Sequence, residues 1–267
     1  MKEREDKRMI SAKDNDLIKQ VSALMTSAKR RRESASFPAE GVRLCLDGVQ
    51  SGARPLCFLY TDQARQKYSE EFALISSASR RCEQVSEAVF RKISDTQTPQ
   101  GFLCVFEALD KNHKSYKIEK KGRYAALETI QDPSNMGTIL RTAEALGADG
   151  VILSDDCCDI MSPKVVRGSM GAVFRVPVVI VSDFTGFIAG LTREGIHTYA
   201  STPREAEDIS LLSFEEGGVM LIGNEGNGLR RETIDACSKS VRINMKGRAE
   251  SLNAAAAAAI LLYRLMS

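Results

Sequence analysis

From Arg123 to the last residue, short apolar segments alternate regularly with segments of helical spacing. Residues 124–130 (YAALETI) are predicted to form a strand, residues 135–147 a helix and residues 150–154 (GVILS) the next strand. Such a βαβ unit has parallel strands covered by a helix. The alternation continues with expected strands at 176–182, 196–202, 217–223 and 240–244, and expected helices at 184–195, 229–238 and from residue 254. The pattern therefore predicts an α/β domain built on a parallel sheet.

The first part of the chain predicts a smaller α/β unit. Residues 9–36 have helical spacing that includes the basic cluster Lys29–Arg32, and residues 42–49, 55–61 and 100–109 are predicted as strands. Residues 110–122 are polar and charged without an apolar period, which is typical of a linker. We therefore expect an N-terminal domain over 1–109, a linker over 110–122 and a C-terminal domain over 123–267.

Composition narrows the class of protein. The 267 residues are 43% hydrophobic and 27% charged, as in soluble globular proteins, and the net charge is only +2, so an anionic partner must be met by local patches. Seven cysteines without a CxxC pair and only two histidines argue for reduced thiols and against a metal centre. The charged N-terminus does not resemble a signal peptide, and no apolar run reaches the ~20 residues of a membrane span. We expect a cytoplasmic protein.

Ligands of open α/β sheets bind beyond the carboxyl ends of the strands, and the first such end here is residues 131–142 (QDPSNMGTILRT). Asn135 is predicted as the N-cap of the following helix. Arg141 points away from the apolar stripe of that helix. It is therefore either a solvated surface arginine or a residue that binds a phosphate.

Two further strand ends are unusual. Gly223, Gly226 and Gly228 follow an apolar strand, and they permit either a tight turn or the close approach of a ligand. Their spacing matches neither the dinucleotide-binding fingerprint nor the phosphate-binding P-loop. In residues 241–265, Ser251 is predicted to cap a terminal helix. That helix begins with Ala254–Ala259, whose small side chains allow close packing by another backbone or a second subunit.

Together these stretches resemble the three signature motifs of the SpoU (TrmH-like) branch of the SPOUT RNA 2′-O-ribose methyltransferases. The matching residues are Asn135, Gly137, Arg141 and Thr142 in the first motif, Gly223–Gly226, Gly228 and Leu229 in the second, and Ile243, Met245, Gly247 and Glu250–Asn253 in the third. Residues 162–178 resemble the family through Lys164, Arg167, Ser169 and Gly171. The N-terminal half resembles its L30e-like substrate-binding domain. The chain departs at Asn244, where the family usually has proline, and at Ala254–Ala256, where it has Ser or Val.

The resemblance implies a parallel SPOUT sheet with helices on both faces, a C-terminal trefoil knot and a homodimer. It also implies transfer of a methyl group from S-adenosylmethionine to a ribose 2′-hydroxyl. The added N-terminal domain favours ribosomal RNA as the substrate. Transfer RNA is one alternative, and an inactive RNA-binding or ribosome-assembly protein is another. A nucleotide-binding enzyme is disfavoured by the glycine spacing.

Residue roles follow from the same resemblance. The cofactor would be bound by Gly223, Asn224, Ile243, Met245 and Leu252. Arg141 would bind the phosphate beside the target ribose and stabilise the developing alkoxide, with Asn135 orienting Arg141 or the ribose. The rest of the polar wall would be Glu225, Ser251 and Asn253, and Ser251 and Asn253 would also cap the last helix. The predicted RNA-binding residues are Arg30, Arg31, Arg32, Lys164 and Arg167, although the cluster at 29–32 also fits a solvated helix end. No metal is implied.

Overall fold

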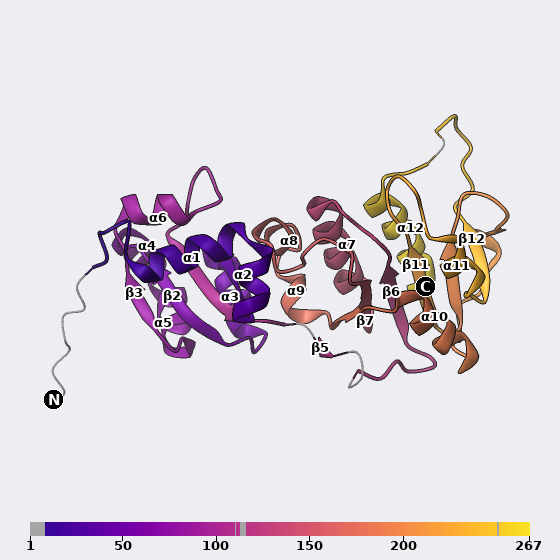
Figure 1. Ribbon diagram of the computed structural model, residues 1–267, viewed down its shortest axis with the longest axis horizontal. Coiled ribbons are helices and arrows are strands. Elements are labelled where there is room, and N and C mark those ends of the chain that lie inside the picture. The colour runs from indigo at the N-terminus through magenta and orange to yellow at the C-terminus, as the bar shows by residue number, and fades with distance from the viewer. Residues whose placement is uncertain (1–8, 110, 113–115, 250) are drawn as a thin grey trace. The chain divides into compact units, whose positions relative to one another are not determined.

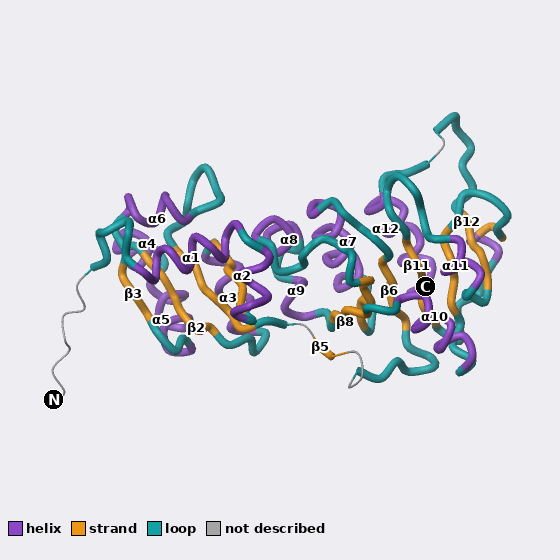
Figure 2. Tube along the Cα trace, in the orientation of Figure 1, coloured by secondary structure: helices purple, strands orange, loops and turns teal. Residues whose placement is uncertain are grey.

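The computed structural model describes residues 9–109, 111–112, 116–249 and 251–267 (Figure 1). It divides into two compact units. The first comprises the described residues up to Leu109 together with Met161–Arg167. The second comprises the described residues of Asp110–Ile160 and Gly168–Ser267. Each unit contains one sheet, whose strands are orange in Figure 2.

The first unit is a four-stranded sheet in the order β1-β4-β2-β3, with helices packed against it. Strand β4 is antiparallel to both its neighbours, whereas β2 and β3 are parallel. The strands are β1 (Ser36–Glu40), β2 (Pro55–Tyr60), β3 (Cys82–Gln84) and β4 (Phe102–Glu107), and the helices are α1 (Asp16–Thr26), α2 (Ala28–Ser34), α3 (Val42–Gln50), α4 (Asp62–Lys67), α5 (Ser69–Ala78) and α6 (Glu87–Ile93). Its core packs Ile18 of α1 and Val89 of α6 on Leu59 and Leu103 of the sheet.

One prediction for this unit is wrong, and one strand was not predicted. Residues 42–49 form helix α3 and not a strand, because the buried positions are Val42, Cys45 and Gly48, three residues apart. Strand β1 was not predicted, and it begins at Ser36, the last residue of the stretch expected to be helical. It begins there because Ala35 adopts a left-handed conformation (φ 45°) that ends α2, with its N–H donating to Arg31 and Arg32 carbonyls. The strands predicted at 55–61 and 100–109 are confirmed as β2 and β4.

The second unit is the predicted parallel α/β domain. Every strand pair in its sheet is parallel, and the order is β10-β12-β9-β11-β6-β7-β8-β5. The strands are β5 (Lys111–Asn112), β6 (Arg123–Leu127), β7 (Gly150–Ser154), β8 (Val178–Val181), β9 (Thr198–Ser201), β10 (Glu207–Asp208), β11 (Gly218–Ile222) and β12 (Lys239–Arg242). Thus β5, within the predicted linker, adds an edge strand beside β8.

Helices cover both faces of this sheet. The helical segments from α7 onward are α7 (Pro133–Ala145), α8 (Pro163–Gly168), α9 (Ala172–Arg175), α10 (Phe184–Arg193), the 3₁₀ turn η1 (Ile209–Leu211), α11 (Arg231–Asp235) and α12 (Ala254–Met266). On one face, Ile188 and Leu191 of α10 pack on Ala126 and Leu221. Successive strand residues point to opposite faces, and α12 contacts β6 and β11 on the other side. The trefoil knot stays a prediction.

The helix caps agree only in part with the predicted ones. Asp132 and not Asn135 caps α7, accepting from Ser134 N (2.7 Å), and Pro133 occupies the first helical position. Of the two residues predicted to cap the last helix, Asn253 caps α12 and Ser251 does not, because Asn253 Oδ1 accepts from Ala255 N (2.9 Å) and Ala256 N (3.3 Å). In the described part of the chain, no helix is both long and apolar enough to cross a membrane.

Candidate functional site

A pocket of about 480 Å³ lies at the carboxyl ends of β9, β11 and β12. This volume is within the range of small-molecule and cofactor sites. The lining residues are 201–203, 222–228, 241–245, Ala249, Ser251, Leu252, Ala254, Ala257 and Leu261. The structure thus brings together all five predicted cofactor-binding residues, Gly223, Asn224, Ile243, Met245 and Leu252, and it adds Glu225 and Ser251 of the predicted polar wall.

The turn after β11 forms one wall of the pocket and is built by close backbone contact. The backbones of Asn224 and Gly228 exchange two hydrogen bonds, of 3.0 and 2.9 Å. A Cβ atom on Gly223 would lie 2.2 Å from the carbonyl carbon of Gly228, so only glycine fits there. Asn224 Oδ1 accepts from Gly226 N (2.8 Å) and Asn227 N (3.2 Å), which fixes the tip of the turn.

A chain of hydrogen bonds joins the three motif segments. Asn253 Nδ2 donates to Asn135 Oδ1 (3.0 Å), and Asn135 Nδ2 donates to Glu225 Oε1 (2.8 Å). Asn135 is only 7% exposed, whereas Glu225 is exposed at the pocket. Because both ends of the Asn135 amide are engaged, this buried side chain sets the orientation of the Glu225 carboxylate. The arrangement presents a fixed hydrogen-bond acceptor beside the pocket.

The structure does not place Arg141 in this pocket. Arg141 is exposed on α7 and lines a separate groove of about 680 Å³ between α7 and α12. The groove also contains Ile260 and Tyr263, which are 41% and 62% exposed. Within one chain, therefore, Arg141 lines a different pocket from the predicted cofactor-binding residues.

The predicted RNA-binding residues are in different environments. Arg30 and Arg32 are exposed on α2, and Lys164 is exposed on α8. Arg167 forms an ion pair with Asp95 (3.0 Å). The prediction that Arg31 lies at the RNA-binding surface is wrong. Arg31 is only 5% exposed, and its guanidinium donates to the backbone oxygen of Leu24. The helical turn of α2 puts this arginine on the buried side.

The turn after β12 forms the opposite wall of the pocket. Asn244, at the position where proline was expected, is exposed and lines the pocket. Ser210 donates to Asp208 through its hydroxyl and backbone N–H, and these bonds, with one from the Asn244 side chain, hold the pKa of Asp208 below its usual range. Asn244 therefore has a polar partner outside the pocket. Glu250 of the predicted third motif lies outside the described residues.

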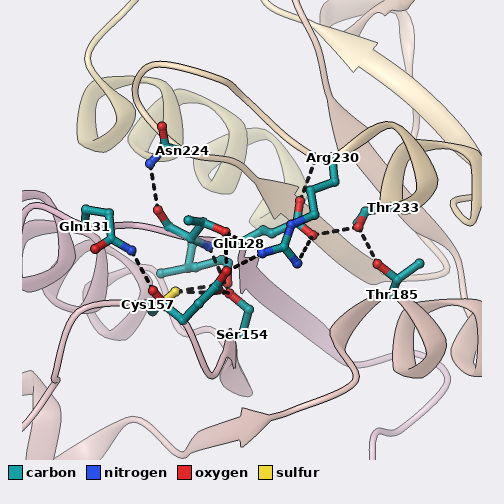
Figure 3. A network of polar contacts seen from close by, with 11 residues as sticks. Glu128, Gln131, Ser154, Cys157, Thr185, Asn224, Arg230 and Thr233 are labelled. Carbon is teal, nitrogen blue, oxygen red and sulfur yellow. Dashed lines mark hydrogen bonds and ion pairs between the residues drawn. The ribbon is translucent and has the colours of Figure 1, made fainter.

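Sequence reasoning missed a polar network behind the second motif (Figure 3). Glu128 is fully buried at the end of β6, where Arg230 forms an ion pair with it (3.6 Å). Arg230 also forms an ion pair with Asp156. The sequence contains one sign of this network, a glutamate within the apolar segment 124–130. A carboxylate that is buried with such a strand requires a polar or charged partner.

Known protein families and relatives match nearly the whole length of the chain. Residues 122–263 match the profile described as the SpoU rRNA Methylase family, and residues 15–104 match the MRM3-like substrate binding domain. The chain is 29% identical to the 23S rRNA (guanosine(2553)-2′-O)-methyltransferase RlmP of Bacillus subtilis, over 97% of this chain and 99% of that protein.

Two solved structures are similar over nearly the full length. The AdoMet-bound rRNA methyltransferase from Sinorhizobium meliloti superposes with a TM-score of 0.86 and 29% identity, covering 97% of each chain. The SpoU methyltransferase AviRb from Streptomyces viridochromogenes, in complex with AdoMet, gives a TM-score of 0.83 and 27% identity, over 94% of this chain and 97% of that one.

Proposed function

Because the chain belongs to the SpoU rRNA methylase family, we propose that it transfers a methyl group from S-adenosylmethionine to a ribose 2′-hydroxyl of ribosomal RNA. The observation that carries this proposal is the pocket, whose walls are the second and third motif segments. The similar Bacillus protein is named as a 23S rRNA 2′-O-methyltransferase, and two similar structures hold AdoMet. The 2′-hydroxyl is absent from DNA, so this chemistry selects RNA.

The pocket fits the adenosine part of S-adenosylmethionine. Ile243, Met245 and Leu252 supply apolar surface on one side, and the backbone at Gly223 and Asn224 supplies hydrogen-bonding groups on the other. A nucleoside requires both, apolar surface for its base and hydrogen-bonding groups for its polar edges. Bound there, S-adenosylmethionine supplies a methyl group activated by its sulfonium.

Glu225, held by Asn135 and through it by Asn253, would orient the attacking hydroxyl. Glu225 is exposed at the pocket, where its carboxylate can accept a hydrogen bond from a ribose hydroxyl. Asn135 and Asn253 keep that carboxylate in place through the hydrogen bonds described above. Alignment of the hydroxyl with the methyl group is the main contribution of the site. Ser251 completes the polar wall of the pocket.

We propose that two copies of the chain associate through the groove between α7 and α12. The exposed Ile260 and Tyr263 give this groove an apolar surface, and such surface is stabilised by burial. Arg141 lines the same groove and would lie at the dimer interface, where its guanidinium would bind an RNA phosphate.

We propose that residues 1–109 bind the RNA and that residues 123–267 carry the reaction, with 110–122 as the linker. Arg30 and Arg32 are exposed on the N-terminal unit, and Lys164 and Arg167 would add phosphate contacts. Since the proposed substrate is ribosomal RNA, we also place the protein in the cytoplasm. Fractionation of cells that express the tagged protein tests this location.

Two measurements test the function. Calorimetric titration with S-adenosylmethionine and its demethylated product should show binding, and an absence of binding to both would contradict the proposal. Transfer of labelled methyl groups should occur to ribosomal RNA and not to transfer RNA. Transfer only to transfer RNA would overturn the substrate assignment, and cofactor binding without transfer to either RNA would favour the assembly protein. Mapping ribose methylation in cells with and without the gene identifies the nucleotide.

A further inference from the structure

Both ends of the turn at Asn224–Arg230 are hydrogen-bonded to the segment Glu128–Thr129, which directly follows β6. At its start, Asn224 Nδ2 donates to the backbone oxygen of Thr129 (2.8 Å). At its end, Arg230 N donates to Glu128 Oε2 (2.8 Å) and Arg230 Nη2 donates to Thr129 Oγ1 (3.2 Å). The turn that forms one wall of the pocket is therefore held against β6 by two attachments (Figure 3).

Glu128 makes the second attachment dependent on the charge of Arg230. The Glu128 side chain is 0% exposed, and Thr233 Oγ1 donates to its Oε1 (2.6 Å). The Arg230 guanidinium supplies the positive charge that faces it, with Nη1 at 3.6 Å from Oε1. A buried carboxylate without such a partner is strongly destabilising. Arg230 therefore cannot leave Glu128 without a large cost.

Thr129 is held in a conformation that a β-branched residue rarely adopts, with φ at +56°. Its N–H donates to Ser154 Oγ (2.9 Å), and its hydroxyl donates to Asp156 Oδ2 (3.0 Å) while accepting from Arg230. Such a conformation persists only where several contacts enforce it. Arg230 contributes twice, through Thr129 and through its ion pair with Asp156.

From these contacts we propose that Arg230 is a positioning residue for the cofactor. Its guanidinium joins Glu128, Thr129 and Asp156 and so holds the turn in the position in which Gly223–Glu225 line the pocket. Arg230 is not among the described residues that line the pocket, so it acts through the turn. The inference rests on the proposed function, because it takes S-adenosylmethionine as the ligand of this pocket.

The test compares Arg230→Met with Arg230→Lys and with Arg231→Met. Arg231 is the matched control, because its side chain is 74% exposed and it pairs with Asp235 on the surface. Arg230→Met should raise the Kd for S-adenosylmethionine, measured by calorimetry, by about tenfold or more. The KM for the cofactor should rise similarly. The kcat at saturating cofactor should stay near the wild-type value, because Asn135 still holds the Glu225 carboxylate, and so should the Kd for RNA. Arg230→Lys should recover part of the affinity, because lysine restores the charge without the planar fork.

A double variant covers the case in which Arg230→Met does not fold. Glu128→Gln/Arg230→Met removes the unpaired buried charge and the guanidinium contacts with Thr129 and Asp156, so only the backbone N–H of residue 230 still holds the end of the turn. We expect it to melt cooperatively and still bind S-adenosylmethionine about tenfold more weakly than wild type. Wild-type affinity in either folded variant would overturn the inference, as would an equal loss in Arg231→Met. If the wild-type protein itself binds no S-adenosylmethionine, it is the proposed function that fails.

Discussion

Replacing Gly223 by alanine would put a methyl carbon 2.2 Å from the carbonyl carbon of Gly228 and 2.3 Å from Leu229 N. Both are backbone atoms, so the turn itself must move. We expect Gly223→Ala to destabilise the fold by about 1–3 kcal/mol and to weaken cofactor binding. Thermal melting and calorimetry measure the two effects. Gly226→Ala is the control, because its Cβ would be 3.5 Å from Asn224 Oδ1, an ordinary contact, and a comparable loss there would contradict the explanation.

The ionised carboxylate of Asp156 should make the stability of the fold depend on pH in the acid range. Burial acts to raise the pKa of Asp156, but hydrogen bonds from Ser154 and Thr129 and the charge of Arg230 outweigh it and hold that pKa below 3.8. A carboxyl group with a lowered folded-state pKa contributes stability that is complete above the unfolded value and is lost as the pH falls through the folded value. The contribution of Asp156 should therefore begin to fall near about pH 4 and be lost at more acid pH.

Asp156→Asn tests that dependence. We expect a lower melting temperature than wild type at neutral pH, and a difference that shrinks as the pH is lowered from about 5 to about 3. Melting curves recorded by circular dichroism at intermediate pH values measure it. A difference that stays constant over this range would show that the carboxylate charge of Asp156 is not what stabilises the network.

At the scale of the element, α12 depends on one residue for its start and for its link to the site. Asn253 Oδ1 caps α12, while Asn253 Nδ2 donates to Asn135. Aspartate caps a helix as well as asparagine does but cannot donate, so Asn253→Asp should keep the stability and lose methyl transfer. Asn253→Ala should lose methyl transfer and should also lower the free energy of unfolding by about 1 kcal/mol, because alanine cannot cap the helix. Melting and a methyl-transfer assay separate these effects, and full activity in Asn253→Asp would contradict a role for the Asn135 contact.

The elements show what the sequence could predict. The strands and helices of the C-terminal unit are evident because apolar runs alternate with helical spacing. The second and third motif segments contain most of the residues that line the pocket. Local pattern could not reveal that 42–49 is helical, since its apolar residues fit either period until Phe106 is known to pack against Gly48. The Glu128–Arg230 pair was equally hidden, because it joins residues far apart in the sequence. The buried side of α2 likewise depends on a tertiary contact, between Arg31 and Leu24.

At the scale of the whole molecule, the proposed dimer makes a direct prediction. The wild-type protein should elute with twice the 29.3 kDa mass of one chain in chromatography with light scattering. Ile260→Lys/Tyr263→Lys should be a monomer, because it removes apolar surface and adds charge beside Arg141 and Arg264. Leu74→Lys changes an equally exposed leucine on α5 and should leave the mass unchanged. A dimeric double variant would contradict the proposed interface.

The role proposed for Arg141 also depends on the dimer, because Arg141 lines the groove between α7 and α12 and not the pocket of its own chain. We expect Arg141→Ala to keep the wild-type Kd for S-adenosylmethionine and to reduce methyl transfer by about a hundredfold, as for loss of a charge-stabilising group. Calorimetry and a transfer assay measure both quantities. Normal transfer by this variant would show that Arg141 has no part in the reaction.

The parallel sheet of the second unit also has a consequence for synthesis on the ribosome. Strand β6 pairs with β7 on one side and with β11 on the other, where Arg123 faces Gly218. Its second edge must therefore stay unpaired until β11 has left the exit tunnel, whereas the sheet of the first unit is complete once Glu107 has emerged. An open strand edge invites pairing with other chains. A nascent chain that stalls between these points should thus be a substrate for chaperones, and premature termination there should yield an aggregating fragment.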